Sequence, residues 1–160
     1  MAKHVVNGAT LQCSCSMPTG IVLPPPPPDA PPPDPDAPPE LPSPLPPMGT
    51  GPLTVLPVHR MLSSNQPAAN IMDHVPLVNI PSFGMCISPS SPSVISATSA
   101  ALGVFTPFAC IPKTPAPWTP GSPTVLLDGM PVLNDTSTCM CIDGGTISVV
   151  APGQATEIVP

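Results

Sequence analysis

Asn79-Ile-Pro-Ser-Phe-Gly-Met-Cys86 is a short apolar stretch that contains a glycine turn and ends on a cysteine. Cys86 is the third of six cysteines spread along the chain, which are Cys13, Cys15, Cys86, Cys110, Cys139 and Cys141. We expect the fold to bring most of these thiols together. The simplest interpretation is one small β-rich domain that is pinned by a metal ion.

The composition is poor in the residues that usually build a core. Of the 160 residues, 32 are Pro, 8% are charged and only 2% are aromatic. The mean hydropathy of +0.30 nevertheless separates the chain from charged disordered polymers. A domain with so little core per residue usually needs disulfides, a metal ion or partner subunits for its stability.

The charge and the lack of targeting signals limit the partners. A net charge of −6 with only three Lys and Arg argues against nucleic-acid binding, which needs a basic surface. We find no secretory signal and no apolar run of about 20 residues that could span a bilayer. These features predict a cytosolic protein with reduced thiols, which favours metal binding over disulfides. Free buried cysteines without a metal, and disulfides, are the alternatives.

Residues 24–47 differ from the rest of the chain. Fifteen of these 24 residues are Pro, four are acidic and none is basic. Such a segment is extended polyproline II or linker, and it cannot join the interior of a sheet. It is therefore either a stiff surface insertion or a docking segment for the proline-recognition groove of a partner.

The remaining parts, residues 1–23 and 48–154, are expected to form a single domain of short strands. Asn7-Gly8 and Asp128-Gly129 are strong signals for two-residue β-hairpins. Residues 139–150 are expected to form another hairpin, and residues 53–56 and 58–61 to form further strands.

One helix is predicted, over residues 92–102. Ser91 is a suitable N-cap, Pro92 fits the first helical position, and Gly103 ends the pattern. The fold class is therefore mainly β with one short helix, a long Pro-rich insertion and a C-terminal tail at 155–160.

A weak internal repeat is present. Gln66-Pro-Ala-Ala-Asn70 resembles Met130-Pro-Val-Leu-Asn134, and Asn7-Gly-Ala-Thr-Leu11 is a fainter third copy. Three such units could build a pseudo-threefold object.

The cysteines are the main candidates for chemistry. Alternation along a strand places Cys13 and Cys15 on one face, and four thiolates make a closed structural zinc site. The favoured ligands are Cys13, Cys86, Cys110 and Cys141. Cys139 is the alternate for the last place, and Cys15 is expected to be a small hydrophobic residue.

Catalysis is not expected. The acidic residues lie mostly in the insertion or in turns, and no catalytic motif is visible. The three histidines, His4, His59 and His74, are expected to be surface or packed residues.

Several motifs resemble one known family. Pro67-Ala-Ala-Asn70 is similar to the Pro-Ala-Ala-Arg signature that names the PAAR proteins, with Asn70 in place of the arginine. The wider pattern resembles the PAAR-like family over nearly the whole chain except residues 24–47. It comprises Gly8–Cys13, Leu53–Pro57, Asn79–Cys86, Pro107–Pro112, Pro117-Trp118, Cys139–Cys141 and Gly144–Gln154.

The resemblance implies a fold and a role. PAAR proteins are small cones of β-hairpins that cap the trimeric β-prism spike of contractile injection systems. The partner would be a trimeric VgrG-like spike protein, with effector proteins and the target membrane as further contacts. A zinc ion would stiffen the tip, with cysteines in place of the family's histidines. The protein would assemble in the cytoplasm and leave at the tip of the particle.

Two other functions remain open at this point. One is a free-standing zinc-binding adaptor whose Pro-rich segment recruits protein partners. The other is a small metallohydrolase, which would need an open coordination position and a general base. The sequence shows neither of these two features.

Overall fold

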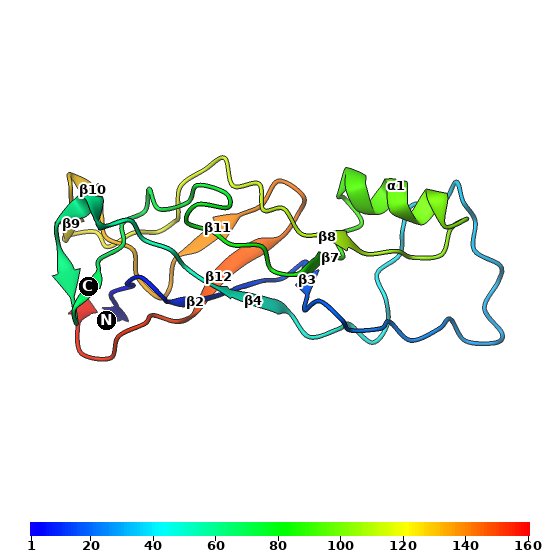
Figure 1. The fold of residues 1–160 in the computed structure, drawn as a ribbon, viewed down its shortest axis with the longest axis horizontal. Coiled ribbons are helices and arrows are strands. Elements are labelled where there is room, and N and C mark those ends of the chain that lie inside the picture. Colours follow the sequence, from blue (N-terminus) through cyan, green and yellow to red (C-terminus); the bar gives the residue numbers. More distant parts are fainter.

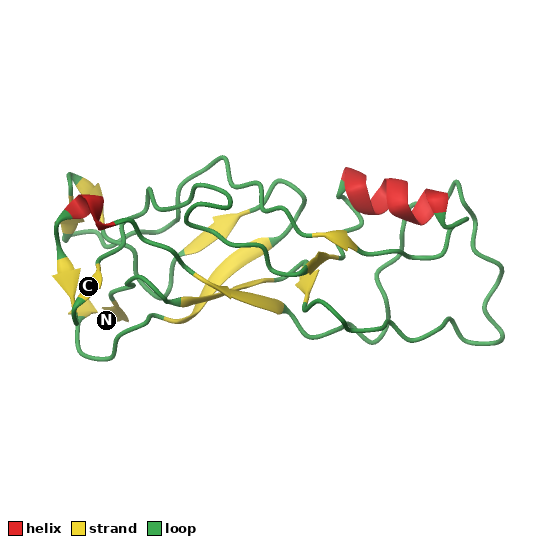
Figure 2. Ribbon diagram, in the orientation of Figure 1, coloured by secondary structure: helices red, strands yellow, loops and turns green.

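The computed structural model describes residues 1–160 and confirms the mainly β class with one short α-helix. The molecule is elongated, with both chain ends at one end (Figure 1). Helix α1 and the Pro-rich segment lie at the other end, and the largest sheet lies between. Loops connect short strands almost everywhere, as Figure 2 shows.

The strands are short and numerous. Their bounds are β1 (Ala2–Lys3), β2 (Thr10–Cys13), β3 (Ser16–Met17), β4 (Gly49–Pro52), β5 (Leu62–Ser63), β6 (Gln66–Pro67), β7 (Met85–Cys86), β8 (Phe108–Ala109), β9 (Leu126–Leu127), β10 (Met130–Pro131), β11 (Thr138–Met140), β12 (Thr146–Ala151) and β13 (Ile158–Val159). The helices are α1 (Pro92–Ala100) and the 3-10 helix η1 (Pro57–His59).

Two antiparallel sheets form the middle of the molecule. The larger has the strand order β11-β12-β2-β4, and the smaller has the order β3-β7-β8. The hairpin predicted over 139–150 is confirmed as β11 and β12. Because β2 continues through a tight turn into β3, the two sheets meet at Cys13 and the residues that follow it.

The end that carries both termini is built from three hairpin-like pairs, and we call it the base. Strands β5 and β6 are joined by Ser64 and Asn65, and β9 and β10 by Asp128 and Gly129. All four residues have positive φ, which is the geometry of type I′ hairpin turns. The Asp128-Gly129 hairpin is thereby confirmed. The third pair, β1 with β13, joins the two ends of the chain in the same antiparallel way.

A closed ring of backbone hydrogen bonds joins the three pairs. The Val5 N–H donates to the Leu133 carbonyl, the Leu133 N–H to Ala69, and the Ala69 N–H to Val5, at 3.0 to 3.1 Å. All three residues are fully buried. They lie 64 residues apart in each step, from Val5 to Ala69 and from Ala69 to Leu133. The ring therefore marks a pseudo-threefold axis through the base.

A second threefold set of hydrogen bonds, which we call the second ring, has its donors two residues after and its acceptors two residues before those of the first ring. Its three hydrogen bonds run from Asn7 N to Pro67 O, from Ile71 N to Pro131 O and from Asp135 N to Lys3 O, at 2.9 to 3.0 Å. The three isolated bridges between these segments follow the same register. The internal repeat is therefore real in the backbone. The copy expected at Asn7–Leu11 was misplaced, because the segment equivalent to Gln66–Asn70 and Met130–Asn134 is Ala2–Val6.

Buried side chains form two cores. The main core has 16 buried residues and includes Trp118, Phe83 and four of the six cysteines. A smaller core under the base consists of Ala68, Leu127, Val132 and Val159. Val159 shows that the C-terminal residues 155–160, expected as a tail, pack against the base through β13.

The hairpin expected at Asn7-Gly8 and two expected strands were wrong, whereas the helix is confirmed with a shorter C-terminal end. The segments beside the Asn7-Gly8 turn do not pair with each other, because Val6 pairs with Ala68 and β2 pairs with β12 and β4. Neither residues 53–56 nor residues 58–61 form a strand, because residues 57–59 form η1 instead. The predicted helix is present but ends at Ala100, and the Ser91 hydroxyl does not cap it.

Candidate functional site

Five cysteines gather where the two central sheets meet, and we call them the thiol cluster. They come from four segments of the chain, and they are Cys13 with Cys15, Cys86, Cys110 and Cys141. Cys13 ends β2, Cys86 ends β7, and Cys141 follows β11. Cys13, Cys86 and Cys110 are buried, whereas Cys15 and Cys141 are half-buried at the edge.

Gly145 holds one side of the cluster together. Its carbonyl accepts a hydrogen bond from the Cys141 N–H at 2.8 Å. A Cβ atom added at Gly145 would lie 2.8 Å from Cys13 Sγ, 3.4 Å from Cys15 Cβ and 3.8 Å from Cys141 Cβ. Three of the thiol-bearing residues therefore surround a position that only glycine can fill without displacing a sulfur atom.

The buried thiols are held in their neutral form. Burial raises the pKa of Cys13 to about 12 and that of Cys110 to about 11, and nearby Cys141 adds to both shifts. Burial also raises the pKa of Cys86, with Asp143 and Cys141 contributing. These thiols are therefore poor nucleophiles at neutral pH, because the thiolate is the reactive form. A metal ion would have to displace their protons.

A polar clamp lies beside the cluster and fixes the turn after Cys141. Lys113 Nζ lies 3.1 and 3.2 Å from the two carboxylate oxygens of Asp143. The hydroxyls of Ser88 and Ser91 also donate to Asp143, to its carbonyl and its carboxylate respectively. These contacts tie the β11–β12 turn to the start of α1, and sequence reasoning gave no sign of them.

Cys139 lies near Cys141, which adds to the burial that raises the Cys139 pKa to about 11, but it lies away from Cys13. Cys139 and Cys13 pair with the same residue of β12, Ile147, from its two sides. With strands about 4.8 Å apart, the Cα atoms of the two cysteines are about 10 Å from each other. Two sulfur atoms bound to one zinc ion at about 2.3 Å lie at most about 4.6 Å apart, and side chains that stand perpendicular to the sheet do not close this gap. The Cys139 thiol instead points to the Ala116 carbonyl at 3.5 Å.

The thiol cluster offers the type of ligand that zinc prefers, but its side chains are too far apart as placed to hold the ion. Thiolates are the ligands that zinc prefers in closed structural sites. As placed, no group of three or more His, Cys, Asp or Glu side chains lies close enough to hold a metal ion. Metal binding would therefore require the sulfur atoms to rotate toward one another.

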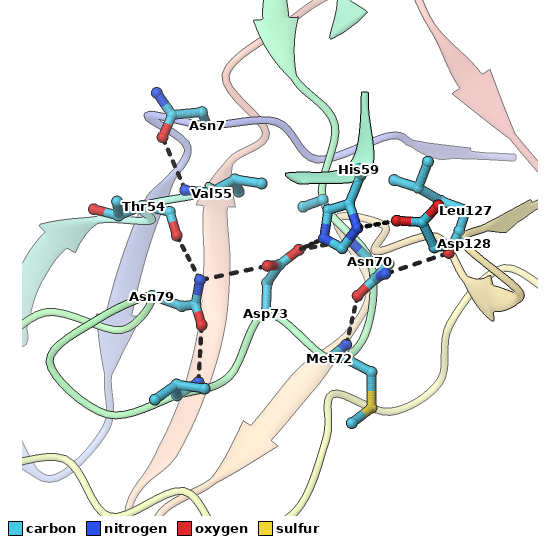
Figure 3. Close-up of polar contacts among 12 residues, drawn as sticks. Asn7, Thr54, Val55, His59, Asn70, Met72, Asp73, Asn79, Leu127 and Asp128 are labelled. Carbon is cyan, nitrogen blue, oxygen red and sulfur yellow. Dashed lines mark hydrogen bonds and ion pairs between the residues drawn. The ribbon is translucent and has the colours of Figure 1, made fainter. Parts of the chain in front are cut away.

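A second polar group lies at the base, and we call His59, Asp73 and Asp128 the histidine clasp (Figure 3). His59 Nδ1 lies 2.6 Å from Asp128 Oδ2, and its Nε2 lies 3.5 Å from Asp73 Oδ2. Partial burial lowers the pKa of His59, but the hydrogen bond to Asp128 and the charge of Asp73 outweigh this and raise it. Burial raises the pKa of Asp73.

The contacts around the histidine clasp hold two turns of the base in place. Asp73 also accepts hydrogen bonds from the Asn70 N–H at 2.9 Å and the Asn79 amide at 3.4 Å (Figure 3). Asp128 belongs to the β9–β10 turn, so His59 ties that hairpin to the Asn70–Asp73 loop. Nothing in the sequence linked these residues, which are far apart along the chain.

The other two histidines are packed residues. His4 is 2% exposed, lies on the pseudo-threefold register at the position of Ala68 and Val132, and contacts the Ala69 carbonyl at 3.3 Å. His74 Nδ1 lies 2.9 Å from the Thr114 carbonyl. Neither histidine belongs to the thiol cluster.

The base exposes one aliphatic side chain from each of its three pairs, and we call these the apolar triad. They occupy equivalent positions, because each pairs with the residue at the same place in the partner strand. They are Leu62, Leu126 and Ile158, which are 59%, 60% and 58% exposed. The base therefore presents an apolar surface with threefold order.

Comparison with known proteins gives one match. Residues 47–154, about two thirds of the chain, match the model of a family described as a domain of unknown function, DUF4280. No curated protein and no solved structure matches the chain. In the structure itself, no helix has the length and apolar character needed to cross a bilayer.

Proposed function

The chain belongs to the DUF4280 family, and we propose that it is a structural spike-tip protein. In this proposal it caps the trimeric β-prism spike of a contractile injection system and sharpens it for membrane puncture. The proposal starts from the resemblance of its motifs to PAAR-like proteins. It assigns no enzymatic activity to the chain.

The observation that carries the proposal is the pseudo-threefold base. A single chain that binds a homotrimer along its axis can contact all three subunits in the same way if it offers each subunit a similar surface. The two hydrogen-bond rings supply that order in the backbone, and the apolar triad supplies it on the surface. Three exposed aliphatic side chains at equivalent positions suit a partner that buries them simultaneously.

The thiol cluster supports a second part of the proposal, a structural zinc ion. The chain has few aromatic residues and few charges, so its stiffness must come from other sources. Zinc bound by Cys13, Cys86, Cys110 and Cys141 would cross-link the two central sheets. The thiols lie between the base and the distal end, where a cross-link resists bending of the tip.

The remaining partners follow from this role. Effector proteins would attach to the sides of the tip, and the target membrane would be contacted during puncture. Assembly would take place in the cytoplasm, before the particle delivers its tip.

Stoichiometry with a VgrG-like trimer from the same organism tests the main proposal. We expect one chain per trimer by native mass spectrometry, because the pseudo-threefold axis would coincide with the axis of the trimer. Equal numbers of chains and spike subunits, or no complex, would contradict it. Changing Leu62, Leu126 and Ile158 together to Asp is expected to weaken binding at least about 100-fold, since each side chain is worth roughly 1 kcal/mol or more when buried.

A matched control lies outside the base. Leu45, in the Pro-rich segment, is 66% exposed, so changing Leu45 to Asp alters a similarly exposed leucine far from the triad. This control is expected to bind the trimer normally. Equal losses in the control and the triad variant would show that the effect does not come from the base.

A further inference from the structure

Residues 24–47, which we call the proline arm, are almost entirely exposed. Twelve of the fifteen prolines are exposed and only Pro39 is buried. The arm contains no strand or helix, and it leaves the domain after β3 and returns at β4. Most of its prolines therefore contribute nothing to the packing of the domain.

The arm is nevertheless fixed to the distal end. Ser99 Oγ of α1 donates to the Pro35 carbonyl at 3.4 Å. Gly103 lies against the Asp34 backbone so closely that a Cβ atom there would come within 2.7 Å of it. Proline also fixes φ near −65°, so the arm loses little conformational entropy when it binds a partner. The arm is thus presented as a preformed ligand.

The negative charges of the arm are not paired with basic residues of the chain. Its four acidic residues, Asp29, Asp34, Asp36 and Glu40, are all exposed and take part in none of the ion pairs. They supply four of the nine acidic residues, against no basic residue in the arm. Lys113, one of only three basic residues in the chain, is occupied by Asp143. A partner with basic groups would therefore find unpaired carboxylates.

We propose that the proline arm is a ligand for an aromatic-lined, basic-rimmed proline-recognition groove on a partner protein, and that residues 23–29 enter the groove. Leu23 and the five prolines that follow are the longest uninterrupted proline run of the arm, and such a run favours the polyproline II conformation. With three residues per turn, the run puts prolines on every face, so one face fills neighbouring aromatic slots. Asp29 follows in a turn that is closed by a hydrogen bond from the Ala30 N–H to the Pro27 carbonyl at 2.9 Å, and it would meet the basic rim there.

The position of the arm allows it to act while the base is covered. The arm and the three hairpin-like pairs lie at opposite ends of the molecule (Figure 1). A partner bound at the arm would not compete with one bound at the base. The inference does not depend on the proposed function, because an isolated chain presents the arm in the same way.

The test titrates the full chain into an isolated EVH1-class domain, whose groove is lined by aromatic side chains. The fluorescence of the groove tryptophan is the readout, since the only tryptophan of this chain, Trp118, is fully buried. We expect saturable binding that weakens at least tenfold when Pro24–Pro28 are replaced by a Gly-Ser stretch of equal length. Replacing Pro44, Pro46 and Pro47 by Gly is the matched control and is expected to preserve binding.

Charge is tested by a second variant, in which Asp29, Asp34 and Asp36 become Asn and Glu40 becomes Gln. We expect a several-fold loss of affinity and a weaker dependence on salt, because the attraction to the basic rim is removed. No binding at about 1 mM, or equal binding by the wild type and the Gly-Ser variant, would overturn the proposal. Loss of binding only in the Pro44–Pro47 control would overturn the assignment to residues 23–29.

Two further measurements distinguish a loss of binding from a loss of folding, and the arm from the base. Thermal unfolding of each variant shows whether the domain is intact, and the arm variants are expected to unfold like the wild type. The triad variant with Asp at positions 62, 126 and 158 is expected to bind the EVH1-class domain normally. A chain that binds this domain but no spike trimer would therefore contradict the proposed function and leave the arm proposal standing.

Discussion

His59 connects two of the three repeats that form the base, and the ionisation of its side chain predicts a pH dependence of stability. Because the folded pKa is raised above 6.5, protonated His59 stabilises the fold fully below that pH. The contribution is lost as the pH rises through the raised folded pKa. The raised pKa of buried Asp73 gives the same sign at lower pH, because stability is lost as the pH rises from about 3.8 through its folded pKa. From His59, stability is therefore expected to fall as the pH rises from 6.5 through the raised pKa of the folded state.

Chemical denaturation of the wild type and His59→Gln at several pH values measures this effect. We expect the variant to lose most of the slope, because its amide does not titrate. Asp128→Asn is the matched control and is expected to lose part of the slope, since the closest carboxylate is removed. A slope that is unchanged in His59→Gln would assign the pH dependence to other groups.

Gly145 is the single position where an added methyl group would act on the thiol cluster. In Gly145→Ala the Cβ would lie 2.8 Å from Cys13 Sγ, so the sulfur must move. We expect a loss of roughly 1–3 kcal/mol in unfolding free energy from overpacking. If zinc binds as proposed, the variant should also hold less zinc per chain by elemental analysis. Gly129→Ala is a control for backbone strain alone, because its φ is +77° and nothing lies within 4 Å.

At the residue scale, the sequence predicted which residues would form the site better than it predicted what each of them contacts. The favoured cysteines, Cys13, Cys86, Cys110 and Cys141, all belong to the cluster, because short β-prone segments and glycine turns deliver them to one junction. Cys15 joined them unexpectedly, since the turn after β2 brings it back beside Gly145. The histidine clasp could not be predicted, because contacts between distant polar residues leave no periodic pattern in a sequence.

Helix α1 ends in a way that predicts a stabilising substitution. The Gly103 N–H donates to the Thr98 carbonyl and the Leu102 N–H to the Ser99 carbonyl, which is the Schellman pattern. Leu102 occupies the left-handed position with φ +55° and is 73% exposed. Glycine adopts this conformation without the steric cost that a side chain adds, and little packing is lost. Leu102→Gly is therefore expected to stabilise the protein by about 0.5–1 kcal/mol.

Gly103→Ala is the opposite test at the next residue. Its φ is +87° and its Cβ would meet the Asp34 backbone at 2.7 Å, so we expect clear destabilisation. Thermal unfolding of both variants measures the pair. Destabilisation by Leu102→Gly would mean that the exposed leucine makes contacts that outweigh its backbone strain.

Turn chemistry predicted elements reliably, whereas apolar runs did not. Asp128-Gly129 formed its hairpin because both residues accept positive φ. Residues 53–56 alternate like a strand, with Leu53 and Val55 buried. Their N–H groups, however, donate to the Ala9 carbonyl and the Asn7 side chain. Contacts with a distant turn thus replace the ladder that alternation suggested.

The sequence predicted the pseudo-threefold base only in part. Its rings consist of backbone hydrogen bonds, which require small or medium buried residues such as Val5, Ala69 and Leu133 but no particular identity. Side chains could therefore diverge while the backbone relation persisted. The third pair was hidden further, because β1 and β13 stand at opposite ends of the chain.

This arrangement predicts the effect of closing the chain. By the register of the base, Pro160 and Met1 occupy the places that Ser64 and Asn65 hold in the β5–β6 turn. Joining residue 160 to residue 1, with Pro160→Asn and Met1→Gly, would complete a third two-residue hairpin with Asn-Gly at its turn. Because cyclisation removes much of the entropy of the unfolded chain, we expect a gain of up to about 4–5 kcal/mol.

Denaturant unfolding of the linear, directly cyclised and linker-cyclised chains checks this prediction. A Gly-Ser linker of about 20 residues closes the chain without the tight turn, so its gain is expected to be smaller by roughly 1–2 kcal/mol. Direct closure that destabilises the protein would mean that the two ends do not meet in the geometry of the other hairpins. In that case the third member of the base would be only an approximate copy, and a threefold partner could not engage all three pairs equally.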